Sequence, residues 1–305
     1  MVTLTDNTRG TLLMIGSMAA FTLNDACMKA LSTSLPLAQS IFLRGLLTTA
    51  LMLGLAWGLG KLNLRMSPRD RLLVALRTLT EVGSAYFFIS ALYNMPFANA
   101  TAILQALPLS ITLAGAVFLG EAVGWRRMAA ILIGFAGVLM IVRPGFDGFN
   151  AYSLYALTAV VLVTARDLLS RRLSRKVETL TVALINAVAV TVVFGIASTT
   201  ITWQPVSAHT ALLLCGASVL IIGGYVFSVS AMRVGEIAVI APFRYTALLW
   251  ALILGFVVFG EWPSILTLIG SAIIVMTGVY TFSRERSLAK AASRQNLTAG
   301  TVDTG

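Results

Sequence analysis

Long apolar segments, separated by short polar stretches, follow one another along almost the whole chain. A helix needs about 20 predominantly apolar residues to cross the hydrocarbon core of a bilayer. Segments of about that length lie at 10–30, 37–58, 71–93, 97–119, 125–142, 151–170, 179–200, 209–232, 237–259 and 262–282. We therefore predict an all-α integral membrane protein with ten transmembrane helices.

The sequence also repeats itself 140 positions later. Residues 83–121 align without a gap with residues 223–261, and ten of the 39 paired positions are identical, ending in Gly120-Glu121 and Gly260-Glu261. We predict a first repeat at 1–142, a linker at 143–150, a second repeat at 151–282 and a disordered tail at 283–305. Because each repeat holds five spans, the two repeats enter the membrane in opposite orientations and form an inverted repeat.

Basic residues gather on one side of this topology. With the N-terminus inside, the predicted cytoplasmic segments hold 16 of the 22 Lys and Arg residues, whereas Arg143 stands alone outside. Cytoplasmic loops are enriched in Lys and Arg, so both termini are expected in the cytoplasm. The net charge of +10, in a chain that is 58% hydrophobic and 11% charged, therefore indicates membrane orientation and not nucleic-acid binding.

Eight ionisable residues remain inside the predicted spans. A charge at the centre of a span costs roughly 2.5–3.5 kcal/mol on insertion scales, so these residues must line a protein interior or wet cavity, pair, or snorkel to the headgroups. The set comprises Asp25, Lys29, Arg44, Arg77, Glu81, Arg166, Asp167 and Arg244.

Helical spacing suggests partners for several of them. The pairs at i,i+4 spacing are Asp25 with Lys29, Arg77 with Glu81, and Asp167 with Arg171. The first lies toward the outer surface and the last toward the inner surface, at positions equivalent under a shift of 142, so we expect these two pairs to gate the two sides. Snorkelling is the alternative for Lys29, Arg166 and Arg171, and a purely structural ion pair is the alternative for Arg77 and Glu81.

Arg44 and Arg244 lie near the centres of their spans and have no acid at helical spacing on the same span. We predict a substrate site made of Arg44, Arg77, Glu81, Arg244 and the neighbouring Tyr245. Three arginines against one glutamate favour an anionic or zwitterionic solute, and nearby aromatic rings suit a planar one. Pro108 and Pro242 interrupt the fourth and ninth spans at positions that do not match in the repeat, where a kink is expected.

Two five-span repeats, each with a span that runs into Gly-Glu and a following span with spaced glycines, resemble the drug/metabolite transporter superfamily of the EamA type. Asn24-Asp25 and Arg44 also resemble the first half of that family, and the resemblance covers residues 9–283. It implies a ten-helix fold, a central cavity lined chiefly by spans three, four, eight and nine, and secondary transport of small organic solutes across a bacterial inner membrane.

We therefore expect a secondary transporter that moves a small organic metabolite, such as an amino acid or a vitamin like riboflavin, by alternating access. A channel-like facilitator and a non-catalytic structural membrane protein are the alternatives. An enzyme is not expected, because the chain contains neither H-E-x-x-H nor G-x-S-x-G, and its single histidine, His209, falls in a predicted external loop. We expect no cofactor and no metal, and partners limited to a small-molecule substrate and the bilayer, as a monomer or homodimer.

The charge asymmetry makes the orientation testable. A reporter enzyme that is active only outside the cytoplasm should be active when fused after Asp147 and inactive when fused after Lys176, because these positions fall on opposite sides of the membrane. Activity measured in intact cells decides between the two orientations. The reverse pattern would contradict the orientation, and equal activity at both positions would contradict the predicted topology.

Overall fold

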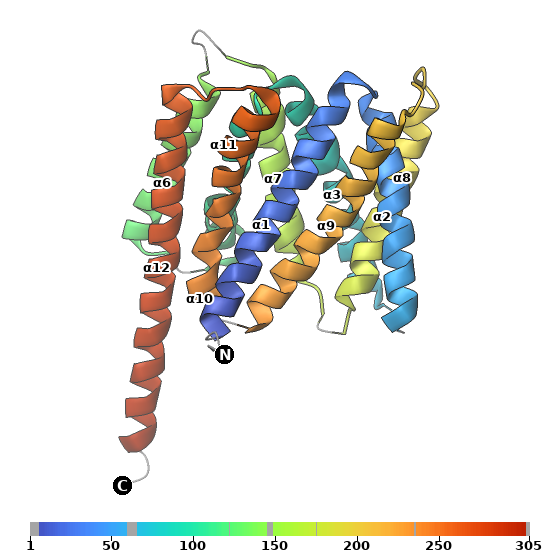
Figure 1. Ribbon diagram of the computed structural model, residues 1–305. Coiled ribbons are helices and arrows are strands. Elements are labelled where there is room, and N and C mark those ends of the chain that lie inside the picture. Colours follow the sequence, from blue (N-terminus) through green and yellow to red (C-terminus); the bar gives the residue numbers. More distant parts are fainter. Residues whose placement is uncertain are drawn as a thin grey trace, which may run out of the picture.

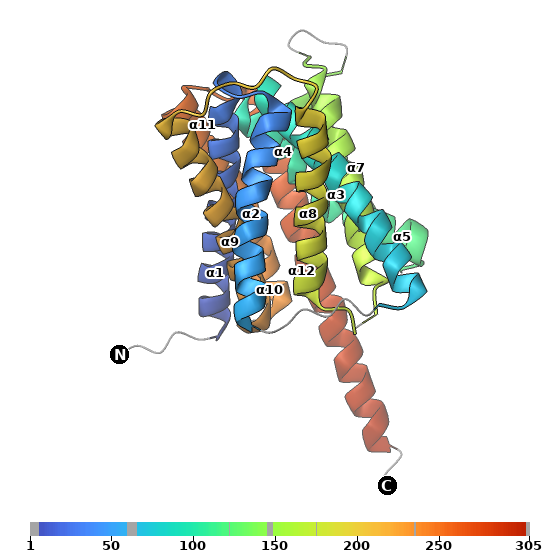
Figure 2. The ribbon, with the colours of Figure 1, turned by 90° about the vertical axis from the view of Figure 1, so that its right-hand side faces the viewer.

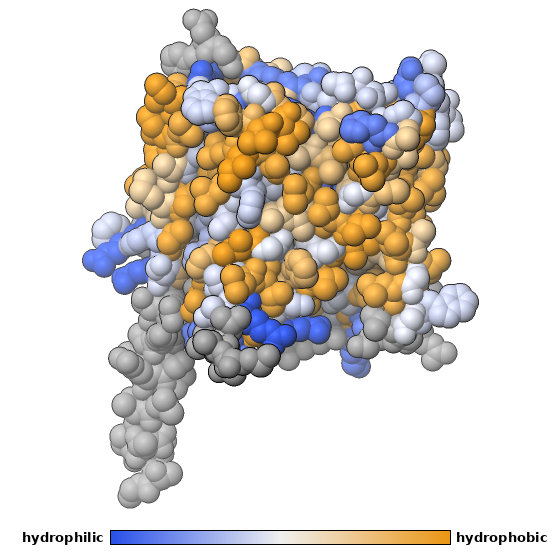
Figure 3. Space-filling model, viewed as in Figure 1, coloured by the Kyte–Doolittle hydropathy of each residue, from blue (hydrophilic) through white to orange (hydrophobic). Residues whose placement is uncertain are grey.

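The protein is a helical bundle in a computed structural model that describes residues 6–59, 66–121, 123–144, 149–174, 176–234 and 236–302, with side chains to residue 284. Ten of its helical segments are long and apolar enough to cross a membrane, as the hydropathy pattern predicts. Figure 1 shows them running roughly between two opposite ends of the bundle, with both chain termini toward the same end. A broad hydrophobic band covers the visible face, and hydrophilic residues gather at its two rims (Figure 3).

The first repeat contains α1 (Asp6–Ala30), η1 (Leu31–Thr33), α2 (Leu37–Leu59), α3 (Pro68–Asn94), α4 (Phe97–Leu104), α5 (Leu107–Leu119) and α6 (Trp125–Val142). The second contains α7 (Tyr152–Arg171), α8 (Thr179–Ser198), α9 (Ala208–Val234), α10 (Ile237–Ile240), η2 (Ala241–Tyr245), α11 (Thr246–Phe259) and α12 (Ile265–Val302).

The two repeats are interleaved. The most extensive helix contacts all join one repeat to the other: α1 packs on α9, α3 on α7, α2 on α8 and α6 on α12. Exchanging the repeats converts the α1–α9 contact into the α7–α3 contact and maps α2–α8 and α6–α12 onto themselves. This is the pattern of an inverted repeat with a pseudo-twofold axis in the membrane plane. Figure 2 shows α1, α2 and α9 toward one side of the bundle, α8 near the middle and α5 on the other side.

The fourth and ninth spans are both broken into shorter helices. The fourth breaks between α4 and α5 at Gln105-Ala106, and the ninth changes from η2 to α11 after Tyr245. Residue 105 corresponds to residue 245 in the repeat, so the breaks are equivalent even though Pro108 and Pro242 are not. Each repeat therefore has a proline near the break in its span, although the two prolines are not at equivalent sequence positions.

The Gly-Glu motif ends both broken spans in the same way. Gly120 and Gly260 have φ of 69° and 63°, in the left-handed region that favours glycine. The following amides turn back, with Glu121 donating to Gly115 O at 3.2 Å and Glu261 to the equivalent Gly255 O at 2.9 Å. A left-handed glycine and a turned-back amide thus end both helices in the same way. This geometry fixes the direction in which each glutamate leaves its helix.

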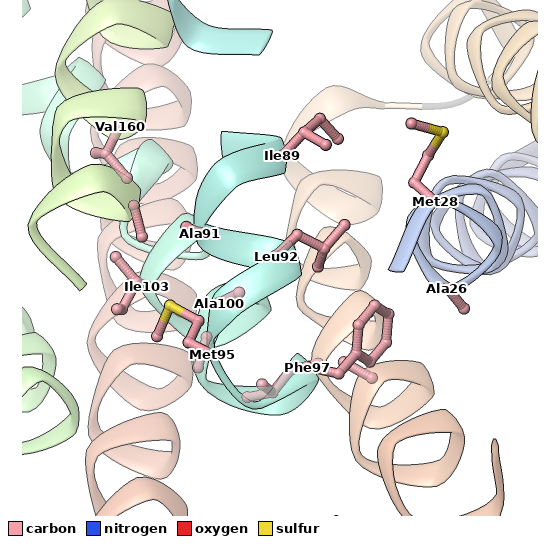
Figure 4. Packing of buried hydrophobic residues seen from close by; sticks show 14 of the residues in the cluster. Ala26, Met28, Ile89, Ala91, Leu92, Met95, Phe97, Ala100, Ile103 and Val160 are labelled. Atoms are coloured by element: carbon pink, nitrogen blue, oxygen red, sulfur yellow. The ribbon is translucent and has the colours of Figure 1, made fainter. Parts of the chain in front are cut away.

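The core surrounds the junction between α3 and α4. Phe97 is fully buried there and lies among side chains of α1 and α3, including Met28 and Leu92, as Figure 4 shows. Val160 of α7 approaches the same cluster from the second repeat. The core thus holds together elements of both repeats near one face of the bundle.

The segment after residue 283 continues the last helix. We expected it to be disordered, whereas α12 continues to Val302 and extends well beyond the rest of the bundle (Figure 1). The segment is rich in Ala, Leu, Lys, Arg and Gln, which have high helix propensity. Those propensities extend a helix that the last span has already nucleated.

Helices α6 and α12 approach each other most closely at Gly137 and Gly270. A Cβ atom on Gly270 would lie 2.5 Å from Gly137 O, and one on Gly137 would lie 2.8 Å from Gly270 O. Small residues of this kind let membrane helices bring their backbones together. The crossing cannot accept a methyl group unless the two helices separate.

We expect Gly270→Ala to lower the free energy of unfolding by about 1–3 kcal/mol, because overpacking forces the backbones apart. Gly54→Ala is the matched control, since that helical glycine has no atom within 4 Å of its would-be Cβ. Thermal unfolding of the purified protein in detergent measures both. Equal melting temperatures for the two variants would show that the crossing tolerates the methyl group.

Candidate functional site

A pocket of about 510 Å³ lies between the two repeats. Its walls come from α2, α3, the end of α7 with the connection to α8, α8 itself and α9. The polar residues that line it are Arg44, Thr48, Arg77, Glu81, Ser170, Ser174, Thr179, Asn186 and Tyr225. The resemblance implied walls from spans three, four, eight and nine. Spans three and eight do line the pocket, together with spans two and seven and the end of span six. No described residue of spans four or nine lines it.

Arg77 projects from α3 toward α7. Its Nε donates to Ser170 Oγ at 2.8 Å, and Ser170 Oγ donates in turn to Arg166 O at 2.8 Å. Its Nη1 is buried and has no hydrogen-bond partner within the described part of the chain. One edge of the guanidinium is therefore held by the protein, while a buried donor beside the pocket stays open.

Arg44 projects from α2 and contacts a neutral group. Its Nη1 donates to Asn24 Oδ1 at 3.4 Å, and Asn24 Nδ2 donates to Asp25 Oδ1 at 2.9 Å. The asparagine thus links the arginine to the carboxylate of Asp25 across two helices. On the opposite wall, Asn186 accepts a hydrogen bond from Thr78 at 2.7 Å.

Glu81 pairs with a residue of the other repeat. The sequence spacing had suggested a partner on its own helix, Arg77. Arg166 of α7 bridges two acids: its Nη1 lies 3.2 Å from Glu81 Oε2, and its Nη2 lies 2.9 Å from Asp167 Oδ1. The expected pairs of Glu81 with Arg77 and of Asp167 with Arg171 are therefore replaced. Arg166 thus forms ion pairs with acids of two helices, whereas its position near a span end had favoured snorkelling.

Lys29 likewise pairs with the other repeat and not with Asp25. Its Nζ lies 2.8 Å from Glu261 Oε1 and donates to Met95 O at 2.6 Å. Glu261 Oε2 also accepts from the amide of Phe97 at 2.5 Å. The pair therefore joins α1, the junction of α3 with α4, and the end of α11 at one face of the bundle.

Arg171 makes the equivalent contact at the opposite face. Its Nη1 lies 2.8 Å from Oε1 of Glu121, the counterpart of Glu261 in the repeat. The two pairs differ in burial: the side chains are 47% and 45% exposed for Arg171 and Glu121, but 10% and 26% for Lys29 and Glu261. One face is thus closed more tightly than the other.

The remaining predicted site residues lie outside the pocket. Arg244 belongs to η2, where its backbone carbonyl accepts from Gln105 at 3.2 Å and its charge interacts with that of Asp167. Tyr245 is buried against Phe282, with ring centroids 6.4 Å apart, and its hydroxyl has no partner among the described residues. The structure therefore brings together three of the five expected substrate residues.

Sequence reasoning missed Glu121, Glu261, Arg166 and the pocket residues Ser170, Asn186 and Tyr225. A signal for the two glutamates was present, because the repeat ends on them. In an inverted repeat, equivalent ends lie on opposite faces, and each glutamate is therefore placed near the basic residue that ends the first span of the other repeat. Within the described ranges, no group of three or more His, Cys, Asp or Glu residues could hold a metal ion.

Comparison with known proteins gives relatives along most of the chain. An S-adenosylmethionine uptake transporter of Rickettsia bellii is 25% identical over 277 residues, which cover 90% of this chain and 94% of that protein. A riboflavin transporter of Vibrio cholerae is 28% identical over 200 residues, covering 65% and 67%. A pseudopaline exporter of Pseudomonas aeruginosa is 25% identical over 278 residues, covering 88% and 93%.

The fold is also similar to that of a solved crystal structure, with a TM-score of 0.64 at 22% identity, over 92% of this chain and 98% of that one. The model of the EamA-like transporter family matches twice, at residues 8–143 and 150–284. These two matches coincide with the two interleaved five-span repeats. The chain therefore belongs to the EamA-like transporter family, a group of multi-pass membrane proteins.

Proposed function

We propose that this protein is a secondary transporter that moves a small organic metabolite across a bacterial inner membrane by alternating access, with both termini in the cytoplasm. The observation that carries the proposal is the pair of equivalent ion pairs, Lys29–Glu261 and Arg171–Glu121, at opposite faces of an inverted repeat. Alternating access requires two conformations of similar energy that expose one site to each side in turn.

The face that carries Lys29 and Glu261 has the contacts of a closed gate. The lysine ammonium lies 5.3 Å from the centroid of the Phe259 ring, and that ring packs against Phe97 at 5.5 Å. Charged hydrogen bonds and aromatic packing together seal the path between α1, α4 and α11. With the proposed orientation, this closed face is the external one.

The pocket reaches the other face. Its lining includes Leu173, Ser174 and Val177, which belong to the connection between α7 and α8 at the end of the bundle that carries the N-terminus. The Arg171–Glu121 pair beside it is half-exposed. We infer that the structure represents an inward-open conformation, in which the internal gate residues are solvated.

The competing functions fit these features less well. A channel does not require two equivalent gates of unequal burial, and a structural membrane protein does not require a pocket lined by two arginines. The family and the relatives are transporters, which supports the absence of catalytic activity that the sequence suggested. Two of the relatives are named for S-adenosylmethionine and riboflavin, which supports a metabolite with a planar ring system as the cargo.

We expect loss of the buried external gate to shift the protein toward the outward-open state. Glu261→Gln removes charged hydrogen bonds that typically contribute about 1.5–3 kcal/mol, which corresponds to a population change of roughly ten- to a hundredfold. In a background with Cys27→Ala and Cys215→Ala, Ala98→Cys reports on the external path and Val177→Cys on the pocket. Labelling with an impermeant maleimide should rise at the first position and fall at the second.

Two further variants sharpen this test. Glu121→Gln should not raise labelling at the external position, because exposed ion pairs contribute only about 0–1 kcal/mol and this one lies on the internal side. Arg143→Gln removes a cation from the external face that bonds Ser264 and no described acid, and serves as the matched control. Identical labelling in Glu261→Gln and Arg143→Gln would show that Lys29 and Glu261 do not form the gate.

A further inference from the structure

The electrostatics of the pocket indicate which chemical group the substrate presents. This inference rests on the transport function proposed above and concerns the same pocket. Four arginines and three acids inside the spans form one interacting cluster, in which each group lies within electrostatic range of at least one other. Its members are Arg44, Arg77, Arg166, Arg244, Asp25, Glu81 and Asp167.

The three acids are already engaged on the protein side. Arg166 bridges Glu81 and Asp167, and Asp25 accepts from Asn24. Arginines therefore outnumber carboxyl groups in the cluster, four to three. Because an uncompensated charge is costly in a low-dielectric interior, one negative charge in the pocket would stabilise the cluster.

Two of these arginines lie on the pocket wall itself. Arg77 has a buried Nη1 without a partner in the described part of the chain, while its Nε is fixed by Ser170 at 2.8 Å. Arg44 lines the same pocket and donates only weakly, at 3.4 Å, to a neutral amide. Guanidinium groups bind carboxylates through charge-assisted, often bidentate, hydrogen bonds, so the two arginines of the pocket wall suit a carboxylate.

The rest of the pocket is apolar. Val182, Ala183, Val190, Ile221 and Ile222 contribute aliphatic surface from α8 and α9. Tyr225 adds an aromatic ring that also meets Phe21 edge-on, with centroids 5.3 Å apart. A volume of about 510 Å³ lies within the range of small-molecule sites and accommodates a single ring system.

We propose that the pocket binds an organic monocarboxylate whose carboxylate accepts hydrogen bonds from Arg77, close to Arg44, and whose apolar or aromatic body lies against α8 and α9. The carboxylate of the substrate offsets positive charge on the pocket wall, and its body fills the aliphatic part of the pocket. An organic cation would meet two arginines, and Glu81 on the wall is already paired with Arg166.

Matched probes test the charge requirement on the purified full-length protein. Indole-3-acetate, indole-3-acetamide and tryptamine share one ring system and differ in a carboxylate, a neutral amide and an ammonium. Thermal stabilisation and calorimetric titration should show binding of indole-3-acetate at least tenfold tighter than that of the amide. Tighter binding of tryptamine or of the amide, or no binding of indole-3-acetate, would overturn the proposal.

Variants of Arg77 separate a direct contact from loss of folding. Arg77→Gln should weaken binding of indole-3-acetate about 10- to 100-fold, as expected for a hydrogen bond to a charged group, and leave the weak binding of the amide unchanged. Arg77→Lys keeps the charge and should recover part of the affinity. Equal losses for acid and amide would assign Arg77 a structural role and refute the carboxylate contact.

The gate measurements keep this inference distinct from the proposed function. Labelling of the cysteine reporters in Glu261→Gln involves no substrate, so a gate that responds while no carboxylate binds would refute only the substrate class. Arg126→Gln provides a matched control for surface charge, because Arg126 lies beside Trp125 and outside the pocket. A loss of indole-3-acetate binding in that variant equal to the loss in Arg77→Gln would attribute the effect to net charge and contradict the pocket assignment.

Discussion

The cost of placing charge inside a bilayer is the constraint on which the rest of this structure depends. Eight ionisable residues lie within the predicted spans, and the hydrophobic band of the surface leaves them no place among lipids. The protein meets that cost by pairing charges between repeats: Lys29 of the first repeat with Glu261 of the second, and Arg166 of the second with Glu81 of the first. Apart from the Arg166–Asp167 contact within α7, these ion pairs join one repeat to the other.

The interleaved packing of the helices follows from the same need. Because α1 packs on α9 and α3 on α7, the charged side chains of one repeat face those of the other at close range. The left-handed helix ends at Gly120 and Gly260 complete the arrangement, since they turn the following glutamates toward basic residues at opposite faces. The identical Gly-Glu pairs at the end of the sequence repeat therefore have a geometric role: the glycine ends the helix and the glutamate forms an ion pair.

The ten spans could be predicted from hydropathy, because length and apolarity alone decide whether a helix crosses a membrane. The inverted repeat followed from five spans per half, and the two matches of the family model agree with it. The pairing partners could not be predicted in the same way. Spacing of i,i+4 along one helix identifies possible pairs, such as Asp25 with Lys29, but it says nothing of the competing partners that packing brings from another helix.

The residues that line the pocket show the same limit of prediction from sequence. Arg44, Arg77 and Glu81 stood out because isolated charges near mid-span need a polar environment, and all three line the pocket. Arg244 met the same criterion, yet it lies in η2, outside the pocket walls, with its charge near Asp167. Depth in the membrane is readable from sequence, whereas the side of the helix that faces the cavity depends on the tertiary packing of neighbouring spans.

The two ion pairs that we propose as gates differ in burial, and this difference affects the relative energies of the proposed conformations. Perfect symmetry between the repeats would make the inward-open and outward-open conformations mirror one another in their gate contacts. Here the basic partner is a lysine at one face and an arginine at the other. Their surroundings differ as well, since Lys29 also contacts the Phe259 ring and Met95 O. A difference of about 1.4 kcal/mol between states changes their ratio tenfold. Small departures from symmetry at the gates are therefore sufficient to set the resting conformation, while the shared backbone architecture keeps the alternative state within reach.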